Sequence, residues 1–469
     1  MRETMTADRL AFRLVTAALA IGCLLGVMHV ACVIGLQVPF DPNEGWNAYF
    51  AQAALTTGSP YPPAHSLMIN NYPPLSFYLV GAIAKITGDA IVAGRVVALF
   101  ALFAVALGIE TAARQMGCNR LEALFAALFF TAGLMLTSDY AGMDDPQLLG
   151  HAIAIGGLVL TLHEPRTSRT MVAAALLFTL AFFVKHNLIV LPAALALWLA
   201  LADRRHAITF VVSGLIFLLI GLGLFKQAFG IGLFDRIASA RTYALANVTS
   251  GLLQWLPWGA VPLAGAAALM AIARRDRHAV LCTVYATAAV AAGAFFLGGA
   301  GVDANALFDA DIALALAAGV LMNRLASSLW VNAAGLLYAV PLVIGLWTLD
   351  ADWRDPDFWF QPMATERRAA AGEIALLRAA HGPALCEMLS LCYWAGKPAD
   401  VDVFNMEQAY LTGARDDMPL ARSIAARHFA AIELEQVTPF PLTQKIRDAV
   451  VQSYKIVRSD DERVFFVPR

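Results

Sequence analysis

The apolar stretch AFRLVTAALAIGCLLGVMHVACVIG (Ala11–Gly35) decides the fold class, because it is long enough to cross a bilayer as one helix. A bilayer core of ~30 Å needs about 20 apolar residues in a helix. The stretch follows Arg2 and Arg9, as a signal peptide would, but it is too long for the apolar region of a cleaved signal. We therefore interpret it as an uncleaved first membrane span.

Apolar runs of similar character recur along the chain and predict an α-helical polytopic membrane protein. Ten further spans are expected near residues 90–112, 121–138, 147–163, 171–184, 187–202, 207–228, 256–273, 279–298, 306–322 and 329–348, which makes about eleven in all. The shorter run 74–86 predicts an interfacial or re-entrant helix. Of the 469 residues, 59% are apolar and 14% are charged, which excludes a disordered chain and an ordinary soluble enzyme. The formal net charge of −2 offers no basic field to nucleic acid.

Positive charges are divided unevenly between alternate loops, which predicts the orientation in the membrane. One set of segments carries Arg2, Arg9, Arg13, Arg114, Arg120, Arg166, Arg169, Arg204, Arg205, Arg274, Arg275, Arg277 and Arg324. The alternate loops carry only Lys85, Lys185, Arg236 and Arg241, with Arg95 and Lys226 at their borders. The positive-inside rule therefore places the N-terminus in the cytoplasm and, after eleven spans, the C-terminus outside.

The composition changes near residue 349, where Pro, Asp, Glu and Arg become common. We therefore divide the chain into a membrane domain, 1–348, and a soluble extracytoplasmic domain, 349–469. Strand-like runs at Val401–Phe404 and Val464–Val467, with helical patterns near 363–380 and 416–428, predict a small α/β fold for this second domain. It contains Cys386 and Cys392, whose spacing permits a disulfide in an oxidising compartment.

Acidic and amide residues collect in the loops on the predicted outer side. The first outer loop, about 37–73, has no lysine or arginine, and the helical spacing of Trp46, Tyr49 and Phe50 predicts a helix on the membrane surface. The third outer loop places Lys185 between two apolar runs. Ionisable residues at membrane depth are costly and usually face a cavity or a partner, so a polar site is expected on this face.

An ordered set of motifs resembles the opening of glycosyltransferase family 39. The set comprises Asp41-Pro42-Asn43-Glu44-Gly45, Tyr72-Pro73-Pro74-Leu75, Gly88, Arg95 and, at the outer end of a span, Asp145-Pro146. That family includes protein O-mannosyltransferases and the aminoarabinose transferase of lipid A, and it has the GT-C membrane fold. The resemblance covers roughly residues 10–200 and implies the same fold here.

The resemblance also implies a reaction on the outer face of the bacterial inner membrane. An inverting glycosyltransferase of this kind takes a sugar from a polyprenyl-phosphate carrier and transfers it to a hydroxyl of a cell-envelope glycan, a lipid or a protein. An acidic residue in the first outer loop accepts the proton of the attacking hydroxyl. The leaving phosphate requires positive charge or N–H donors.

The first-loop motif departs from the family at the position of the base. The family usually has Asp-Glu there and uses the Asp, whereas this chain has Asn43 followed by Glu44. The base is therefore expected to be Asp41 or Glu44, with Asp41 favoured as the acid nearest the first span. Asp145 is expected to orient the acceptor or the base, or to hold a metal.

The phosphate contact departs as well, because some relatives carry Lys where this chain has Tyr72. We rank Lys185 first as the donor-phosphate contact, with Arg95 and Arg241 in reserve. The further candidates for substrate binding are Asn43, Asn71, Tyr72, Asp144, His186, Asp303 and Asn305.

The sequence leaves alternatives open for the cofactor and for the class of protein. No cofactor is required, but a divalent cation, Mg²⁺ or Mn²⁺, would find hard oxygen ligands in Asp41, Glu44 and Asp145. A transporter or flippase for lipid-linked sugars would place its polar groups at the middle of the membrane, whereas here they gather at one face. A second alternative is a non-catalytic relative that binds lipid-linked sugar, because Asn43 stands where the family has its catalytic Asp.

Overall fold

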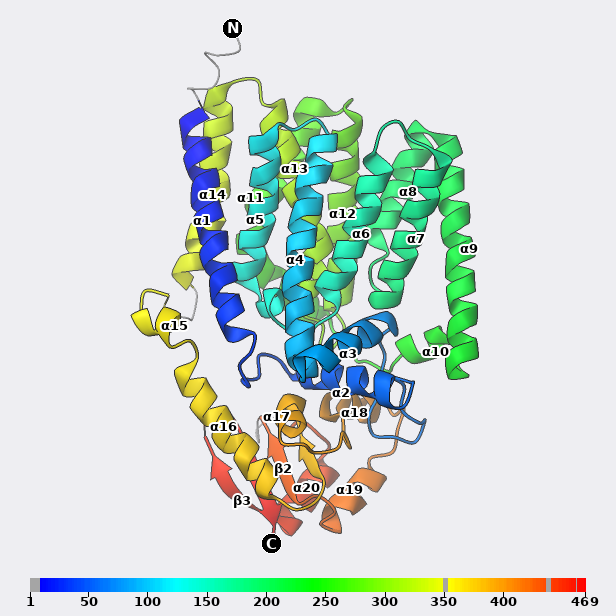
Figure 1. Cartoon of the computed structure of the whole chain (residues 1–469), viewed down its shortest axis with the longest axis vertical. Coiled ribbons are helices and arrows are strands. Elements are labelled where there is room, and N and C mark those ends of the chain that lie inside the picture. The colour runs from blue at the N-terminus through cyan, green and yellow to red at the C-terminus, as the bar shows by residue number, and fades with distance from the viewer. Residues whose placement is uncertain (1–8, 349–352, 436–439, 461) are drawn as a thin grey trace.

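The structure is a computed structural model that describes residues 9–348, 353–435, 440–460 and 462–469. Within these residues, each predicted span is a helix, and the eleven helices run side by side as a bundle (Figure 1). They are α1 (Leu10–Val33), α4 (Ala90–Gln115), α5 (Arg120–Thr137), α6 (Gln147–Leu162), α7 (Ser168–Val184), α8 (Val190–Ala202), α9 (Arg204–Phe229), α11 (Leu245–Ala273), α12 (Arg277–Leu297), α13 (Phe308–Arg324) and α14 (Ser328–Thr348). The fold of a polytopic membrane protein is confirmed.

The helices differ in length and in how much of each is covered by its neighbours. Eight of those described are long and apolar enough to cross a membrane, and α6, α7 and α8 are shorter apolar helices. The span containing α13 is 83% buried, whereas α9 is only 11% buried at the edge of the bundle. Small residues explain the central place of α13, since a Cβ on its Gly319 would already lie 3.0 Å from the Cβ of Ala126.

Two short helices, α2 (Pro42–Thr56) and α3 (Leu75–Thr87), lie across the end of the bundle that faces the C-terminal domain (Figure 1). The Asp41 side chain accepts a hydrogen bond from the Asn43 N–H at the start of α2, and Pro42 occupies the first helical position. The αL conformation of Gly88 ends α3. Both short helices were predicted, and both are confirmed.

The loops on this side of the bundle contain three more short helices, which are η2 (Asp139–Ala141), α10 (Leu233–Ile237) and η3 (Ala304–Leu307). The beginning of α1 lies at the opposite end of the bundle from the C-terminal domain (Figure 1). This arrangement agrees with an odd number of spans between them. The side of the membrane that each end faces stays a prediction.

The C-terminal domain has a four-stranded sheet with helices around it. Its elements are α15 (Pro356–Phe360), α16 (Ala364–Ala379), β1 (Ala384–Cys386), α17 (Leu389–Trp394), α18 (Val403–Leu411), α19 (Met418–Ala425), β2 (Ala431–Leu434), α20 (Gln444–Ser453), β3 (Tyr454–Ser459) and β4 (Val464–Pro468). The sheet order is β1-β2-β4-β3, with β1 and β2 parallel and the other pairs antiparallel. The predicted α/β class is confirmed, as are both helices and the strand at 464–467. The predicted boundary at residue 349, like Arg2, lies outside the described residues.

The strand expected at Val401–Phe404 is wrong. Only Val401 forms a β-bridge, with Leu67, and α18 begins two residues later at Val403. The Asp402 side chain accepts a hydrogen bond from the Asn405 N–H and so caps this helix. A local cap therefore outweighs the alternating pattern of apolar residues.

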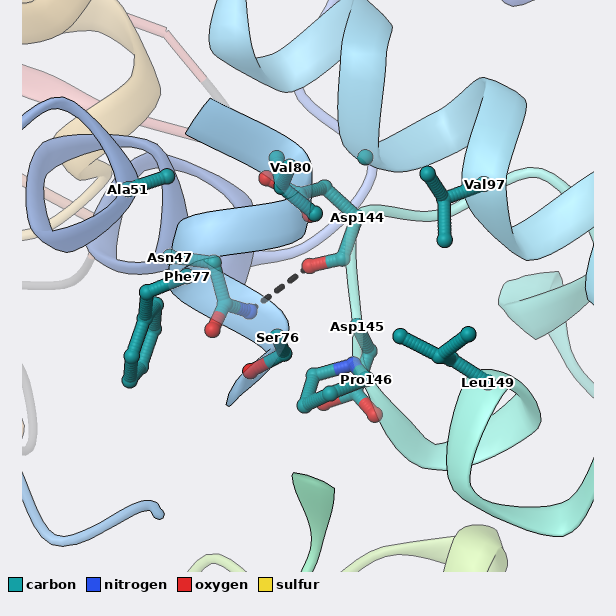
Figure 2. A pocket seen from close by; sticks show the side chains of 11 residues that line it. Asn47, Ala51, Ser76, Phe77, Val80, Val97, Asp144, Asp145, Pro146 and Leu149 are labelled. Carbon is teal, nitrogen blue, oxygen red and sulfur yellow. Dashed lines mark hydrogen bonds between the residues drawn. The ribbon is translucent and has the colours of Figure 1, made fainter. Parts of the chain in front are cut away.

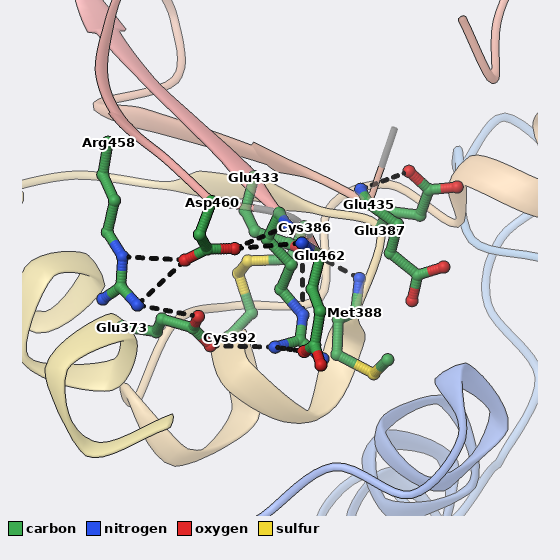
Figure 3. Close-up of polar contacts among 11 residues, drawn as sticks. Glu373, Cys386, Glu387, Met388, Cys392, Glu433, Glu435, Arg458, Asp460 and Glu462 are labelled. Carbon is green, nitrogen blue, oxygen red and sulfur yellow. Dashed lines mark hydrogen bonds and ion pairs between the residues drawn. A yellow bond between two sulfur atoms is a disulfide. The ribbon is translucent and has the colours of Figure 1, made fainter. Parts of the chain in front are cut away.

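A disulfide joins Cys386 at the end of β1 to Cys392 in α17, as the spacing permitted (Figure 3). Beside this disulfide, Glu373 forms ion pairs with Arg458 and Arg463 (Figure 3). The stapled helix α17 packs directly on α2 of the membrane domain.

Candidate active site

The buried ion pair between Glu44 and Arg95 holds the chain between α1 and α2 in place. Arg95 Nε lies 2.7 Å from Glu44 Oε1, and Arg95 Nη2 lies 2.7 Å from Glu44 Oε2. Both side chains are fully buried. Arg95 also donates to the carbonyl oxygens of Ile34, Leu36 and Val38, so all five of its N–H groups have acceptors.

The Glu44 carboxylate is fully used by the protein itself. In addition to Arg95, it accepts hydrogen bonds from the backbone N–H groups of Phe40 and Asp144. A carboxylate held in this way is poorly placed to take a proton from a substrate, and Arg95 has no N–H left for a phosphate. We therefore do not carry Glu44 as the base, or Arg95 as a phosphate contact, into our proposal.

Asp41 is the acid of the first outer loop that retains the properties of a base. Burial raises the pKa of its carboxyl to about 6, although the hydrogen bond from the Asn43 N–H acts in the opposite direction. The charges of Asp145, Glu44 and Asp303 raise it further. A carboxylate with a pKa near 6 is still ionised at neutral pH and is a stronger base than an ordinary aspartate.

Asp145 and Lys185 form a second ion pair, although two helices, α6 and α7, separate them in the sequence. Lys185 Nζ lies 3.3 Å from Asp145 Oδ2 and 3.6 Å from the centre of the Tyr72 ring. Lys185 is only 4% exposed, yet its charge is retained. Burial lowers the pKa of the ammonium, but Asp145 and Tyr72 outweigh this and raise it above its usual value. The site therefore presents a fixed, desolvated positive charge.

Asp144 has a different environment from Asp145, although the two are adjacent in the sequence. It lines a small pocket with Asn47, Ser76 and Gly94, and its carbonyl oxygen accepts from Asn47 Nδ2 (Figure 2). Within the described structure, neither Asp144 Oδ2 nor Ser76 Oγ has a hydrogen-bond partner. Burial, followed by the charges of Glu44 and Asp145, raises the pKa of Asp144 well above its usual range. Asp144 also contacts α4 so closely that a Cβ on Gly94 would overlap its side chain.

The other predicted residues surround this group or join it to the C-terminal domain. His186 has its ring centre 6.4 Å from that of Tyr72, and burial together with the charges of Lys185 and Arg241 lowers its pKa to about 4. Asn71 Nδ2 donates to Ser239 Oγ. Arg241 donates to the carbonyl oxygen of Ala300 and to Asn405 Oδ1, which leaves it at the contact between the domains.

Two predicted residues lie on the loop before α13. Asp303 precedes η3, which contains Asn305, and the Asp303 carbonyl oxygen accepts from the Ala306 N–H. The charge of Asp303 contributes to the raised pKa of Asp41. The loop therefore faces the same group of acids.

Sequence reasoning missed Gln147 and Asp402. Gln147 is 1% exposed, and its side chain contacts His151 Nε2 at 3.0 Å and Asn187 Nδ2 at 3.4 Å. Its N–H also donates to Asp145 Oδ1. A polar residue directly after Asp145-Pro146, at the start of an apolar helix, was the available signal. Asp402, in the C-terminal domain, had no such signal.

Metal binding stays a prediction. Within residues 9–348 and the described parts of the C-terminal domain, no group of three or more His, Cys, Asp or Glu residues is placed to hold a metal ion.

Comparisons with known proteins place the fold. No curated protein matches the sequence. A family described as a 6-pyruvoyl-tetrahydropterin synthase related domain, membrane protein, matches residues 69–249, which is less than half of the chain. The structure of ArnT from Cupriavidus metallidurans bound to undecaprenyl phosphate is similar, with a TM-score of 0.62, 14% identity and 97% of each chain covered. Its apo state gives 0.62, 15% and the same coverage.

An oligosaccharyltransferase from Archaeoglobus fulgidus, in complex with Zn and sulfate, has a TM-score of 0.49 and 12% identity, covering 96% of this chain and 73% of its own. The ArnT match spans the bundle, the two crossing helices and the C-terminal domain. This chain therefore has the GT-C fold.

Proposed function

We propose that this protein is an inverting glycosyltransferase that moves a sugar from a polyprenyl phosphate to an acceptor hydroxyl on the outer face of the bacterial inner membrane. The acceptor belongs to a cell-envelope glycan, a lipid or a protein. One observation carries the proposal: the buried cation of Lys185, paired with Asp145, lies in the same group of charges as the basic carboxylate of Asp41. The shared fold with ArnT, whose structure contains undecaprenyl phosphate, supports the donor class.

Asp41 acts as the general base in this proposal. As the acceptor oxygen attacks the anomeric carbon, its proton passes to the Asp41 carboxylate, and the bond from that carbon to the phosphate oxygen breaks with inversion. The electron pair of the broken bond leaves with the polyprenyl phosphate. Such proton transfer requires the hydroxyl to lie within hydrogen-bond reach of the carboxylate, directly or through one water.

Lys185 stabilises the leaving phosphate. An ammonium group has three N–H donors, and its contact with Asp145 leaves others for phosphate oxygens. The charge is already oriented and desolvated, so little reorganisation is needed as negative charge develops on the leaving group. Asp145 in turn keeps Lys185 in place.

The position of the site at the end of the bundle suits a donor that has an apolar polyprenyl chain and a polar phosphate with its sugar. The polyprenyl chain can stay in the bilayer while its phosphate and sugar reach the loops around α2 and α3. The polar groups gather at this end, which favours an enzyme over a transporter with a site at the middle of the membrane.

The test is a transfer assay with purified protein in lipid nanodiscs. Radiolabelled polyprenyl-phosphate sugars are offered with delipidated envelope glycans to the wild type, Asp41→Asn, Lys185→Met and a control variant, Asp235→Asn, at an exposed position of α10. We expect Asp41→Asn to bind donor but lose at least about 100-fold in transfer, Lys185→Met to bind donor more weakly, and Asp235→Asn to behave as wild type. Bound donor without turnover by the wild type would establish a non-catalytic binding protein instead.

A further inference from the structure

A buried carboxylate of the C-terminal domain, that of Asp402, lies at its contact with the candidate site and is 3% exposed. Its Oδ2 accepts hydrogen bonds from Trp46 Nε1 at 2.9 Å and from Asn405 Nδ2 at 2.6 Å. The Trp46 N–H is shared with the carbonyl oxygen of Ile69, at 3.0 Å. Its Oδ1 accepts from the Asn405 N–H and caps α18. Its own N–H donates to the carbonyl oxygen of Leu67 in the first outer loop. Asp402 therefore bonds directly to two parts of the membrane domain.

Trp46 continues this connection toward the lysine. Its side chain is 5% exposed, and its ring centre lies 4.9 Å from that of Tyr72 in an edge-on contact. The Tyr72 ring is the surface on which Lys185 Nζ rests, at 3.6 Å from the ring centre. The position of the Trp46 ring therefore limits where the Tyr72 ring, and with it the ammonium group, can lie.

The same turn of α18 also bonds to a second outer loop. Asn405 Oδ1 accepts from Arg241 Nη2 at 3.4 Å, and the Phe404 ring lies 5.0 Å from the Arg241 guanidinium. Gln408 Oε1 accepts from the Thr242 hydroxyl at 2.8 Å. The beginning of α18 is thus fixed from both sides, so that Asp402 is a rigid support for Trp46.

We propose that Asp402 is a positioning residue of the polyprenyl-phosphate site, which acts through Trp46 and Tyr72 to fix the Lys185 ammonium where a phosphate can bind. The inference rests on the proposed function and extends it. It makes the C-terminal domain a part of the donor site through Asp402.

The experiment measures the binding of undecaprenyl phosphate, without any sugar, to the full chain in nanodiscs. Asp402→Ala removes the acceptor, Trp46→Phe removes the indole N–H but keeps an aromatic ring, and a double variant combines them. Asp417→Ala is the matched control, because Asp417 also bonds through its side chain in this domain, to Thr443 and Lys445, away from Trp46. The unfolding midpoint of each variant is recorded alongside.

We expect Asp402→Ala and Trp46→Phe each to raise the Kd by about tenfold, the effect of one hydrogen bond of ordinary strength. The double variant should be about as weak as either single variant, because both changes break the same connection. Asp417→Ala should leave the Kd within about twofold of wild type. A purely stabilising role for Asp402 would lower the unfolding midpoint without changing the Kd.

The inference is overturned if Asp402→Ala binds as the wild type does, or if the two changes add fully in the double variant. If Asp402→Ala does not fold, Asp402→Asn takes its place, because its Oδ1 can still cap α18 while its amide nitrogen cannot accept from Trp46. Weaker binding by these variants with no sugar transfer by the wild type would refute only the proposed function. Transfer that depends on Asp41 and Lys185 but not on Asp402 would refute only the inference, and a wild type that does not bind undecaprenyl phosphate refutes both.

Discussion

Arg95 of α4 and Glu44 of α2 face each other through two parallel contacts of 2.7 Å, and neither side chain is exposed to solvent. Planar guanidinium and carboxylate groups match best in this arrangement. The pair fixes the beginning of α2, where Asp41 lies. Glu44, in the motif that resembles glycosyltransferase family 39, therefore has a structural contact, and our proposal assigns the chemistry to the neighbouring Asp41.

Breaking this pair from one side should destabilise the protein strongly. Arg95→Ala leaves the Glu44 carboxylate buried without a counter-ion, which costs about 3–5 kcal/mol. Thermal unfolding in detergent should show a large fall in the midpoint. The double variant Arg95→Met with Glu44→Gln should recover part of the loss, because no unpaired charge is left. An unchanged midpoint for Arg95→Ala would show that the pair does not hold the linker.

The rate of transfer should depend on the ionisation of Asp41. Burial raises the pKa of its carboxyl to about 6, and only the ionised form can accept a proton. The rate at saturating acceptor should therefore be constant above about pH 7 and fall tenfold per pH unit well below pH 6. A profile measured in nanodiscs between about pH 4 and pH 8 checks this. The same profile in Asp41→Glu should shift, and a profile with no acidic limb would exclude Asp41 as the base.

The same pKa predicts that Asp41 makes the folded protein more stable as the pH falls, whereas most aspartates make it less stable. Because the folded-state pKa of Asp41 lies above its unfolded value, the ionised form opposes folding, and its cost is relieved as the pH falls through about 6. In Asp41→Asn this contribution is absent. The difference in unfolding midpoint between Asp41→Asn and wild type should therefore shrink between about pH 7 and pH 5. A difference that is independent of pH would contradict the raised pKa.

The aromatic ring of Tyr72 should contribute to donor binding through Lys185. Their contact of 3.6 Å is desolvated, and such a cation–π contact is worth about 1–2 kcal/mol. Tyr72→Leu should therefore weaken the binding of undecaprenyl phosphate several-fold, whereas Tyr72→Phe, which keeps the ring, should lose less. Equal losses in both variants would show that the hydroxyl, not the ring, matters.

A methyl group at Gly45 should separate the two domains where α17 packs on α2. A Cβ at this position would lie 2.1 Å from the Ser390 backbone nitrogen, too close for any rotation of a side chain to relieve. Gly45→Ala should lower the unfolding midpoint and weaken donor binding together. Gly22→Ala in α1 is the control, since a Cβ there meets nothing within 4 Å. Wild-type behaviour of Gly45→Ala would mean that α17 does not support the site.

The sequence predicted candidate site residues only where they fall in recognisable motifs or at the ends of apolar runs. The sequence suggested Asp41, Asp145 and Lys185 because each stands at the end of an apolar run on one predicted side, and the structure brings Lys185 and Asp145 into contact. Their roles stay predictions. The sequence also suggested Glu44 as a possible base and Arg95 as a reserve phosphate contact, but the structure pairs them with each other. Nothing in the local pattern of charges distinguishes an acid that meets an arginine from one that faces a substrate.

The sequence by itself determined the helices and their order, because whether a segment spans the bilayer depends on the apolar content of about 20 consecutive residues. It also determined the helix start at Asp41, since a cap depends on residues two or three apart. The tertiary structure alone decided which charges meet: Glu44 with Arg95, Asp145 with Lys185, and Trp46 with Asp402 across 356 positions of sequence. Those partners depend on how whole helices and domains pack, and no window of sequence contains that information.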